Sequence, residues 1–298
     1  SLHDALPIYT HREEDDINAF AITSAWMLTR FGTAVFRTDS FLKGVDWDEK
    51  KEKWLNERTI NNAHVGFFFE RLAEMDKPKV ESLSFKRDQF YDFMRFQPVA
   101  WDSELLRICL ECWGSTIEAL PDIYDKERIM QTQDALFISS MKLLSMKSEQ
   151  RYGKKEYQRY KEWINKIYPQ RCREFKDIAY LSENDAEGKY LGRVLDAIAE
   201  AKDKGTSVFI YGAGRHGTEF ASYLDRKKIF FDGFLVSAKE GNPNDIGGHY
   251  VYEARAKIRR GGTLIIIAVA RDSVDLIKKM IDEVSDNPND VLSLEEVL

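Results

Sequence analysis

Three glycines that follow a short apolar run are the residues whose spacing points most clearly to chemistry. Gly212, Gly214 and Gly217 come after the run Val208–Tyr211 in the pattern G-x-G-x-x-G, and a helical pattern opens at Thr218. A strand, a glycine turn and a helix form the context in which this motif binds phosphate. Glycine lets a ligand approach the backbone, and the helix N-terminus offers free N–H groups. The sequence therefore predicts a phosphate-binding turn.

Three basic side chains join this turn in the prediction. Arg215 and His216 stand at the mouth of the helix, and Arg271 follows the apolar strand predicted at 263–270. Ligands of parallel sheets bind beyond the carboxyl ends of the strands, so both loops are expected at one edge, where these side chains would meet phosphate. Exposure to solvent is the alternative for Arg215 and His216.

The end of the next strand narrows the choice of ligand. A dinucleotide site usually has an acid there, about 20 residues after the glycines, that holds a ribose hydroxyl. Here the strand predicted at 229–236 ends in Ser237 and Ala238, and Glu240 belongs to the loop. The sequence therefore favours a nucleotide or nucleotide-sugar over NAD. NAD binding and an empty structural turn stay open.

Composition excludes some classes of protein and of site. The chain has 298 residues, a length typical of two domains, and its net charge of −6 argues against nucleic acid as a partner. No apolar run reaches the length of a membrane span. Three cysteines suit a reducing compartment better than a disulfide scaffold. Cys109 and Cys112 form C-x-x-C within a helical pattern, which favours two buried thiols over a metal or redox site.

The N-terminal part alternates helical and strand patterns. The acidic cluster 13–16 predicts a helix start, with a metal-binding carboxylate group as the alternative. Residues 17–30 and 61–75 have helical patterns and 33–37 and 79–85 have strand patterns, whereas the charged residues 46–57 predict an exposed segment.

The order of these elements resembles the second half of a family 2 glycosyltransferase of the GT-A type, closest to bacterial enzymes that build surface polysaccharides. The stretches AWMLTRFGTAVFRTDSFLK, NNAHVGFFFERLAEM and KVESLSF carry the resemblance. It implies transfer of a sugar from a nucleotide-sugar to a glycan or lipid-linked acceptor. The nucleotide-binding half and the Asp-x-Asp metal site of that family are not recognisable. We therefore expect an inactive C-terminal fragment, with a divalent metal only in the other half.

Two further expectations accompany this resemblance. Residues 1–8 resemble translated sequencing adapter, which fits a fragment. His64 stands where the family often has an acid that serves as base. Imidazole titrates near neutral pH and can take a proton from an acceptor hydroxyl, whereas a capping or packing role is the alternative.

The middle of the chain predicts helices. Residues 86–146 are mostly helical in pattern and form a small subdomain. Residues 147–176 hold ten lysines and arginines and four glutamates, interleaved with aromatic residues. Such a stretch can lie on an anionic membrane surface or pack its rings on a neighbouring helix, and we favour packing.

The polar stretch 182–188 predicts a domain boundary, and strands alternate with helices after it, as in a parallel sheet. The stretches IYGAGRHGTEFASYL, FDGFLVS, NPNDIGGHYVYE and LIIIAVA resemble the small nucleotide-sugar-binding domain that precedes the acyltransferase part of bacterial sugar acyltransferases. The resemblance includes the three glycines and His216. No acyltransferase hexapeptide repeat follows, so acyl transfer is not implied.

The combined prediction is an α/β protein in three parts. Residues 9–95 form a partial glycosyltransferase segment on the acceptor side, 96–181 a helical subdomain, and 182–298 a small Rossmann-like sheet that binds UDP or a nucleotide-sugar. The alternatives are a non-catalytic module that senses a nucleotide-sugar and an NAD-dependent oxidoreductase. The expected location is cytoplasmic, with contact to the inner face of the membrane through 147–176 as a further alternative.

Overall fold

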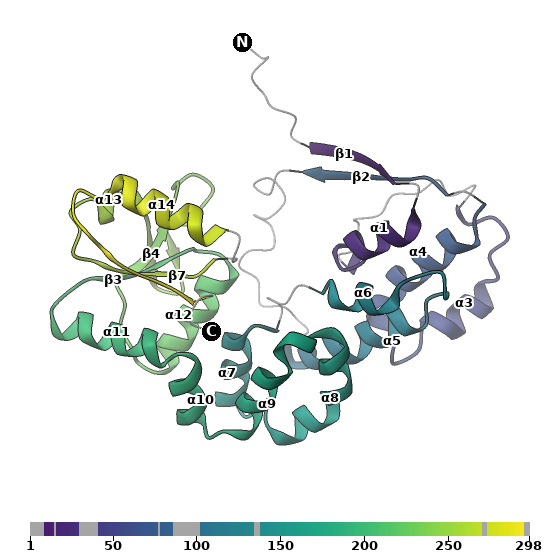
Figure 1. Cartoon of the computed structure of the whole chain (residues 1–298), viewed down its shortest axis with the longest axis horizontal. Coiled ribbons are helices and arrows are strands. Elements are labelled where there is room, and N and C mark those ends of the chain that lie inside the picture. The colour runs from purple at the N-terminus through teal and green to yellow at the C-terminus, as the bar shows by residue number, and fades with distance from the viewer. Residues whose placement is uncertain are drawn as a thin grey trace, which may run out of the picture. The chain divides into compact units, whose positions relative to one another are not determined.

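A computed structural model of the chain describes residues 9–14, 16–29, 41–76, 78–85, 102–133, 138–269 and 273–294. The chain forms two compact units, each assembled from two segments (Figure 1). The first unit comprises Ser1–Ile138 and Lys155–Phe175, and the second comprises Ser139–Lys154 and Lys176–Leu298. Residues of the predicted helical subdomain are thus shared between the units, whereas the predicted sheet domain lies wholly in the second.

A two-stranded sheet and a capped helix open the first unit. Strand β1 (Tyr9–Glu14) pairs antiparallel with β2 (Val80–Phe85), so the strand predicted at 79–85 is confirmed. The helix start predicted at 13–16 is wrong for Glu13 and Glu14, which pair in β1. Asp16 acts as the cap: its carboxylate accepts hydrogen bonds from the backbone N–H groups of Asn18 and Ala19. Helix α1 (Ile17–Ser24) therefore begins there. The strand predicted at 33–37 lies outside the described residues.

Short helices make up most of the rest of this unit. They are η1 (Met27–Thr29), α3 (Trp47–Trp54), η2 (Ile60–Asn62), α4 (Ala63–Glu74), η3 (Asp102–Glu104), the π-helix η4 (Arg107–Cys112), α5 (Trp113–Glu118), α6 (Lys126–Gln131), α8 (Lys154–Ile167), η6 (Pro169–Arg171) and α9 (Cys172–Tyr180). Asp46 and Asp125 cap α3 and α6 as Asp16 caps α1. Helix α8 begins, and α9 ends, in residues of the second unit.

The prediction of an exposed segment at 46–57 is confirmed for most of these residues but not for Lys50 and Trp54. These residues contain α3, whose Lys50 and Trp54 are buried. The indole of Trp54 lies against α4 where Gly66 has no side chain, since a Cβ there would come within 2.2 Å of the ring. Charge density predicted the exposed residues but not the buried face of α3, which carries a large ring and an ion-paired lysine.

The basic and aromatic stretch packs its rings inward. Tyr157, Tyr160 and Tyr168 are buried, as the packing interpretation predicts. Trp163 of α8 covers Gly114 of α5, where a Cβ would lie 2.1 Å from the ring. A helical glycine thus admits a tryptophan at two places in the first unit.

The second unit combines helices with a sheet. Its elements are α7 (Ser140–Ser148), α10 (Glu183–Tyr190), α11 (Gly192–Asp203), β3 (Val208–Tyr211), α12 (Arg215–Arg226), β4 (Gly233–Val236), β5 (Asp245–Ile246), β6 (His249–Glu253), α13 (Ala254–Ile258), β7 (Leu264–Ile267), α14 (Val274–Val284) and β8 (Asp290–Ser293). The polar stretch 182–188, where a domain boundary was predicted, forms the N-cap and most of α10. Ser182 caps this helix by accepting a hydrogen bond from the backbone N–H of Asp185. The carboxylates of Glu183 and Asp185 in the first turn interact favourably with the positive end of the helix dipole.

The sheet has six strands in the order β5-β6-β4-β3-β7-β8. All neighbours pair in parallel except the hairpin β5–β6. The predicted α/β class is therefore confirmed. The chain builds the sheet outward from β3 to β4 and β6, then crosses back to β7 and β8. The direction of winding thus reverses between β3 and β7.

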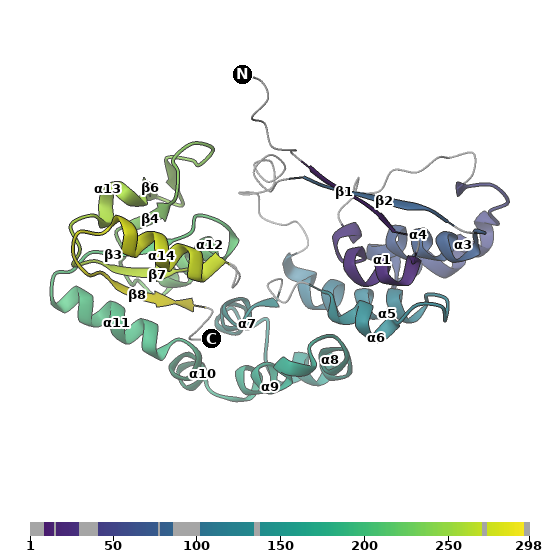
Figure 2. The same cartoon turned by 45° about the horizontal axis from the view of Figure 1, so that its top comes forward.

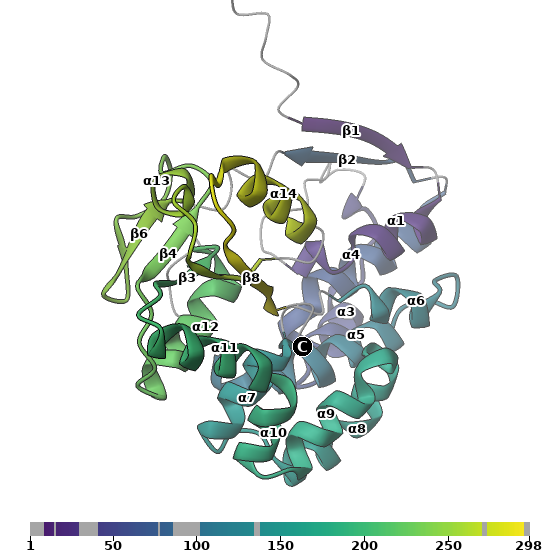
Figure 3. The same cartoon turned by 60° about the vertical axis from the view of Figure 1, so that its left-hand side comes forward.

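Helices cover both faces of this sheet, with α13 and α14 on one side and α11 and α12 on the other (Figures 2 and 3). The core under α13 and α14 includes Phe209, Tyr211, Leu235, Ile265 and Ile267. Tyr211, at the end of β3, is aligned with Leu235 of β4 and Ile267 of β7. The glycine turn therefore leaves the central strand at the carboxyl edge of the sheet.

Candidate functional site

The glycine turn begins at the end of β3, beside the end of its neighbour β7. Gly212 has φ +114°, a conformation that side chains rarely adopt. A Cβ on Gly212 would lie 2.7 Å from the carbonyl oxygen of Ala268 and 2.8 Å from Cγ1 of Val269. The turn after β3 and the loop after β7 are therefore in contact, as the sequence predicted for the two loops at this edge.

The other two glycines of the motif have opposite surroundings. A Cβ on Gly217 would lie 1.7 Å from the carbonyl oxygen of Gly212, so helix α12 is packed tightly on the turn. A Cβ on Gly214 would have no neighbouring heavy atom within 4 Å. Gly214 is also the N-cap of α12, with φ −85° and ψ −165°, an extended conformation open to any residue. The backbone at Gly214 is thus accessible to a ligand at the first turn of a helix.

The two basic residues at the helix mouth differ in their contacts. Nε of Arg215 donates to Oε1 of Glu219 at 3.0 Å, along the same helix, and Oε2 of Glu219 accepts from the hydroxyl of Ser139 at 3.5 Å. His216 is half-buried. Of these two predicted phosphate ligands, Arg215 would have to share its guanidinium with Glu219. Arg271 lies outside the described residues.

Two hydroxyl groups meet at the neighbouring strand end. Strand β4 ends at Val236, and Oγ of Ser237 lies 2.7 Å from the hydroxyl of Tyr211 at the end of β3. Burial raises the pKa of the Tyr211 phenol, so this hydroxyl is protonated at neutral pH. The sequence showed Ser237 at this position. It gave no sign that Tyr211, which is distant in sequence, would be its partner.

His64 lies in the first unit, in the first turn of α4. Its Nε2 donates to the carbonyl oxygen of Leu28 at 2.9 Å. Burial lowers the pKa of the ring against the effect of hydrogen bonds to the carbonyls of Leu28 and Thr29. The ring therefore ties α4 to the 3-10 helix η1, and its assignment as a base stays a prediction.

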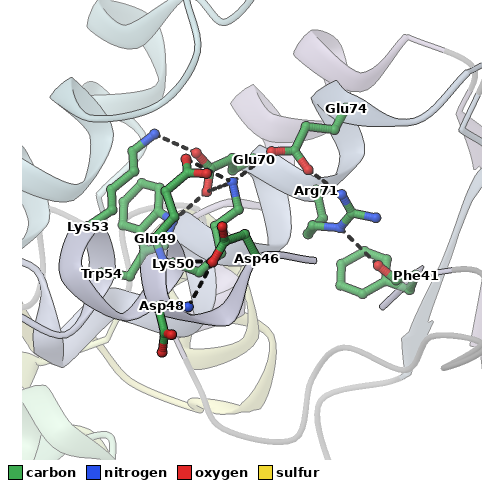
Figure 4. A network of polar contacts seen from close by, with 10 residues as sticks. All are labelled: Phe41, Asp46, Asp48, Glu49, Lys50, Lys53, Trp54, Glu70, Arg71 and Glu74. Carbon is green, nitrogen blue, oxygen red and sulfur yellow. Dashed lines mark hydrogen bonds and ion pairs between the residues drawn. The ribbon is translucent and has the colours of Figure 1, made fainter. Parts of the chain in front are cut away.

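A buried network of charges between α3 and α4 was not foreseen from the sequence (Figure 4). Nζ of Lys50 lies 3.1 Å from Oε2 of Glu70 and 2.7 Å from Oε1 of Glu74. Oε2 of Glu70 also accepts from Nε1 of Trp54 at 2.6 Å, and Oε1 accepts from Nζ of Lys53 at 2.5 Å. The spacing of Glu70 and Glu74 on α4 was the available signal, since residues four apart share one face of a helix.

Arg71 extends this network to the segment before α3. Its guanidinium pairs with Glu74 and donates to the carbonyl oxygens of Phe41 at 2.9 Å and Lys43 at 3.2 Å. Burial acts to lower the pKa of Lys50, but hydrogen bonds to Glu74 and Glu70 outweigh it and raise the pKa. Because these charges neutralise one another, the network fixes α3 on α4 rather than offering a charge to a ligand.

The thiols are placed for packing. Cys109 and Cys112 lie in the π-helix η4, and both are buried and free of disulfide bonds. Sγ of Cys112 accepts from Asn61 and Arg107, each at 3.4 Å. Burial raises the pKa of this thiol, so it stays protonated at neutral pH. Within the described part of the chain, no group of three or more His, Cys, Asp or Glu side chains is arranged to hold a metal ion.

Comparisons of the chain with protein-family models, with curated proteins and with solved structures found no match. Across the described ranges, no helix has the length and apolar character needed to cross a bilayer.

Proposed function

We propose that the second unit is a Rossmann-like domain that binds a nucleotide, with a nucleotide-sugar as the favoured class, at the glycine turn 212–217. The order of the strands supports this fold. Without the hairpin strand β5, the parallel strands lie in the order third, second, first, fourth, fifth along the chain. This is the order of a dinucleotide-binding half-sheet and its first two strands beyond the switch point.

The contrast among the three glycines carries the proposal. Gly212 and Gly217 are crowded by backbone atoms, whereas the space above Gly214 is open. In the phosphate-binding fingerprint the first glycine makes the turn, the second admits the pyrophosphate, and the third lets the helix pack closely. A purely structural turn would need the two crowded glycines but not the open one.

The site is also chemically suited to phosphate. The first turn of α12 presents backbone N–H groups, and the helix dipole favours an anion at this end. His216 lies in that turn and can donate a hydrogen bond to a phosphate oxygen. Ser237 at the end of β4 supports a nucleotide or nucleotide-sugar over NAD, because an acid that would hold the ribose diol is missing from this position.

Glycosyl transfer by the first unit is a proposal that rests on the sequence resemblance. In that role the first unit would contact a glycan or lipid-linked acceptor, and the nucleotide-sugar of the second unit would be donor or regulator. To act as base, His64 would have to release its hydrogen bond to the Leu28 carbonyl. The alternative is a binding module in which the nucleotide-sugar only regulates a partner.

Isothermal titration calorimetry of the full chain tests nucleotide binding. The titrants are UDP, a panel of nucleotide-sugars, and NAD in both redox states. We expect a uridine ligand to bind, and Gly214→Val to weaken that binding by about tenfold or more because the new side chain fills the open approach. The matched control is Gly188→Val, since Gly188 also has no heavy atom near an added Cβ.

The outcomes separate the alternatives. Unchanged affinity in Gly214→Val would show that the ligand binds elsewhere. Preferential binding of NAD would replace the proposal with an oxidoreductase. Binding of none of these ligands would leave the glycine turn as scaffold.

A further inference from the structure

A carboxylate on helix α12 holds the arginine that stands beside the glycine turn. Nε of Arg215, the first residue of α12, donates to Oε1 of Glu219 at 3.0 Å. This acceptor lies about one helical turn farther from Gly214 along α12. Side chains on a helix usually lean toward its N-terminus. The guanidinium of Arg215 is instead drawn along the helix toward its C-terminus, away from the turn.

Glu219 is itself held in place from a second helix. Its Oε2 accepts a hydrogen bond from the hydroxyl of Ser139 at 3.5 Å, and the same hydroxyl accepts from the backbone N–H of Lys142 as the N-cap of α7. Ser139 is buried, and the side chain of Glu219 is 19 % exposed. Because Ser139 holds the carboxylate, Glu219 does not follow when Arg215 turns toward a ligand. The ion pair must then break.

A phosphate bound at the turn competes with Glu219 for Arg215. The open space at Gly214 and the N–H groups of the first turn place the proposed phosphate at the N-terminal end of α12. A guanidinium binds phosphate oxygens through charge-assisted hydrogen bonds, which are strong. The pair of Arg215 with Glu219 is partly exposed, so its net contribution is small, and a diphosphate can displace the carboxylate.

We propose that Arg215 exchanges Glu219 for phosphate when the ligand binds, and that Glu219 thereby limits the affinity of the site for a nucleoside diphosphate. This inference rests on the proposed nucleotide binding and adds a residue that determines affinity. Arg215 contacts the ligand, whereas Glu219 is a positioning residue, since it acts through Arg215.

A double-mutant cycle tests the exchange. UDP is titrated calorimetrically into the full chain, Glu219→Gln, Arg215→Met and the double variant. Glu219→Gln is expected to tighten UDP binding about threefold, because the guanidinium no longer has to leave a carboxylate. Arg215→Met is expected to weaken binding about threefold in the unmodified chain and about tenfold in the Glu219→Gln background, where no ion pair is lost.

A second pair of arginine and glutamate supplies the matched control. At the other end of α12, Nη1 of Arg226 lies 3.5 Å from Oε1 of Glu149, and the side chain of Arg226 is 38 % exposed, against 39 % for Arg215. Glu149→Gln removes one negative charge from a similar pair, and we expect it to change UDP affinity by less than about 1.5-fold. The thermal midpoint of each variant checks the fold.

The Arg215→Met background separates exchange from a simple effect of charge. Exchange predicts that Glu219→Gln leaves UDP affinity unchanged in that background. Equal tightening with and without Arg215 would overturn the inference, because Glu219 would then act on the ligand through its own charge. Weaker binding of UDP in Glu219→Gln would also overturn it, since Glu219 would then orient Arg215 toward the phosphate.

Inorganic pyrophosphate is the second probe, and it separates this inference from the proposed function. If pyrophosphate binds with the same coupling between Arg215 and Glu219 but UDP does not bind, the exchange stands and the nucleotide assignment fails. If UDP binding depends on Gly214 but shows no such coupling, the exchange fails alone. If neither compound binds, both proposals fail.

Discussion

Gly217 lies so close to Gly212 that an added Cβ would sit 1.7 Å from the Gly212 carbonyl oxygen. Helix α12 and the end of β3 are thus in backbone contact across the turn. Because the turn and the helix are held at this distance, the open space above Gly214 is part of a rigid frame. Gly212 and Gly217 allow this close packing, and Gly214 leaves the backbone of the turn accessible.

We predict that Gly217→Ala destabilises the protein by about 1–3 kcal/mol or more, because the methyl group forces α12 away from the turn. Urea unfolding measured by circular dichroism gives the free energy. Gly188→Ala and Gly192→Ala are controls with open space around the added atom, and alanine stabilises helices relative to glycine. Equal stability of Gly217→Ala and the unmodified chain would contradict the packing described for this turn.

A second prediction compares two acids that face the same lysine. Glu70 lies 3.1 Å from Nζ of Lys50 and is 7 % exposed, whereas Glu49 lies 3.6 Å from it and is 64 % exposed. Glu70→Gln is expected to cost about 3 kcal/mol, since it leaves a buried ammonium with less compensation. Glu49→Gln is expected to cost less than about 0.5 kcal/mol. Chemical denaturation of both variants tests the difference, and an equally small loss in Glu70→Gln would show that the buried network adds no stability.

The same network predicts how stability depends on pH. Burial acts to raise the pKa of Glu70, but hydrogen bonds from Lys53, Trp54 and Lys50 outweigh it and lower the pKa below its ordinary value. The pKa of Glu74 is likewise lowered by Lys50 and Arg71 against the effect of burial. A carboxylate whose pKa is lowered on folding stabilises the protein above its unfolded pKa, about 4.3.

We therefore expect the free energy of unfolding to decline as the pH falls from about 5 through the lowered pKa values. Equilibrium unfolding in urea at a series of pH values measures the decline. In Glu70→Gln the decline should be smaller, because one of the titrating groups is gone. If the free energy of unfolding depends on pH to the same extent in Glu70→Gln as in the unmodified chain, other carboxylates are responsible for the acid sensitivity.

The fourth prediction concerns a fragment. Helix α7 contacts α10 and α12, and its Leu143 and Leu144 are buried. A fragment cut at the polar stretch 182–188 lacks α7 and exposes the apolar surface that it covers. Residues 182–298 are expected to unfold at a lower temperature than the second unit does in the full chain, by several degrees or more. An equal midpoint in differential scanning calorimetry would show that α7 adds nothing to this unit.

The sequence was most informative where pattern and local chemistry coincide. The glycine spacing, the apolar runs of β3 and β7 and the helical pattern of α12 all predicted elements that the structure contains. Boundaries differed because caps decide them: α12 starts at Arg215, after Gly214, rather than at Thr218, and α10 starts after Ser182. The α/β class follows from the order of such elements alone.

Partners that are distant in sequence could not be predicted. The hydrogen bond between Tyr211 and Ser237 depends on the parallel register of β3 and β4. The burial of Lys50 depends on Glu70 and Glu74 arriving from another helix. In both cases the residue types are ordinary, and only the tertiary pairing gives them a role. The position of Arg271 lies outside the described residues, so its predicted contact with phosphate stays a prediction.

The two units alternate along the chain, and this affects how the protein is made. Synthesis produces α7 before Lys155–Phe175, which belong to the first unit, and before α10 and α12, which cover α7. Domains usually fold as units in the order in which they emerge from the ribosome. The first unit cannot be complete until residue 175 has been synthesised. By then α7 has been synthesised, but α10 and α12, which cover it, have not. During this stage of synthesis the nascent chain therefore exposes apolar surface of both units at once, and chaperones bind such surface.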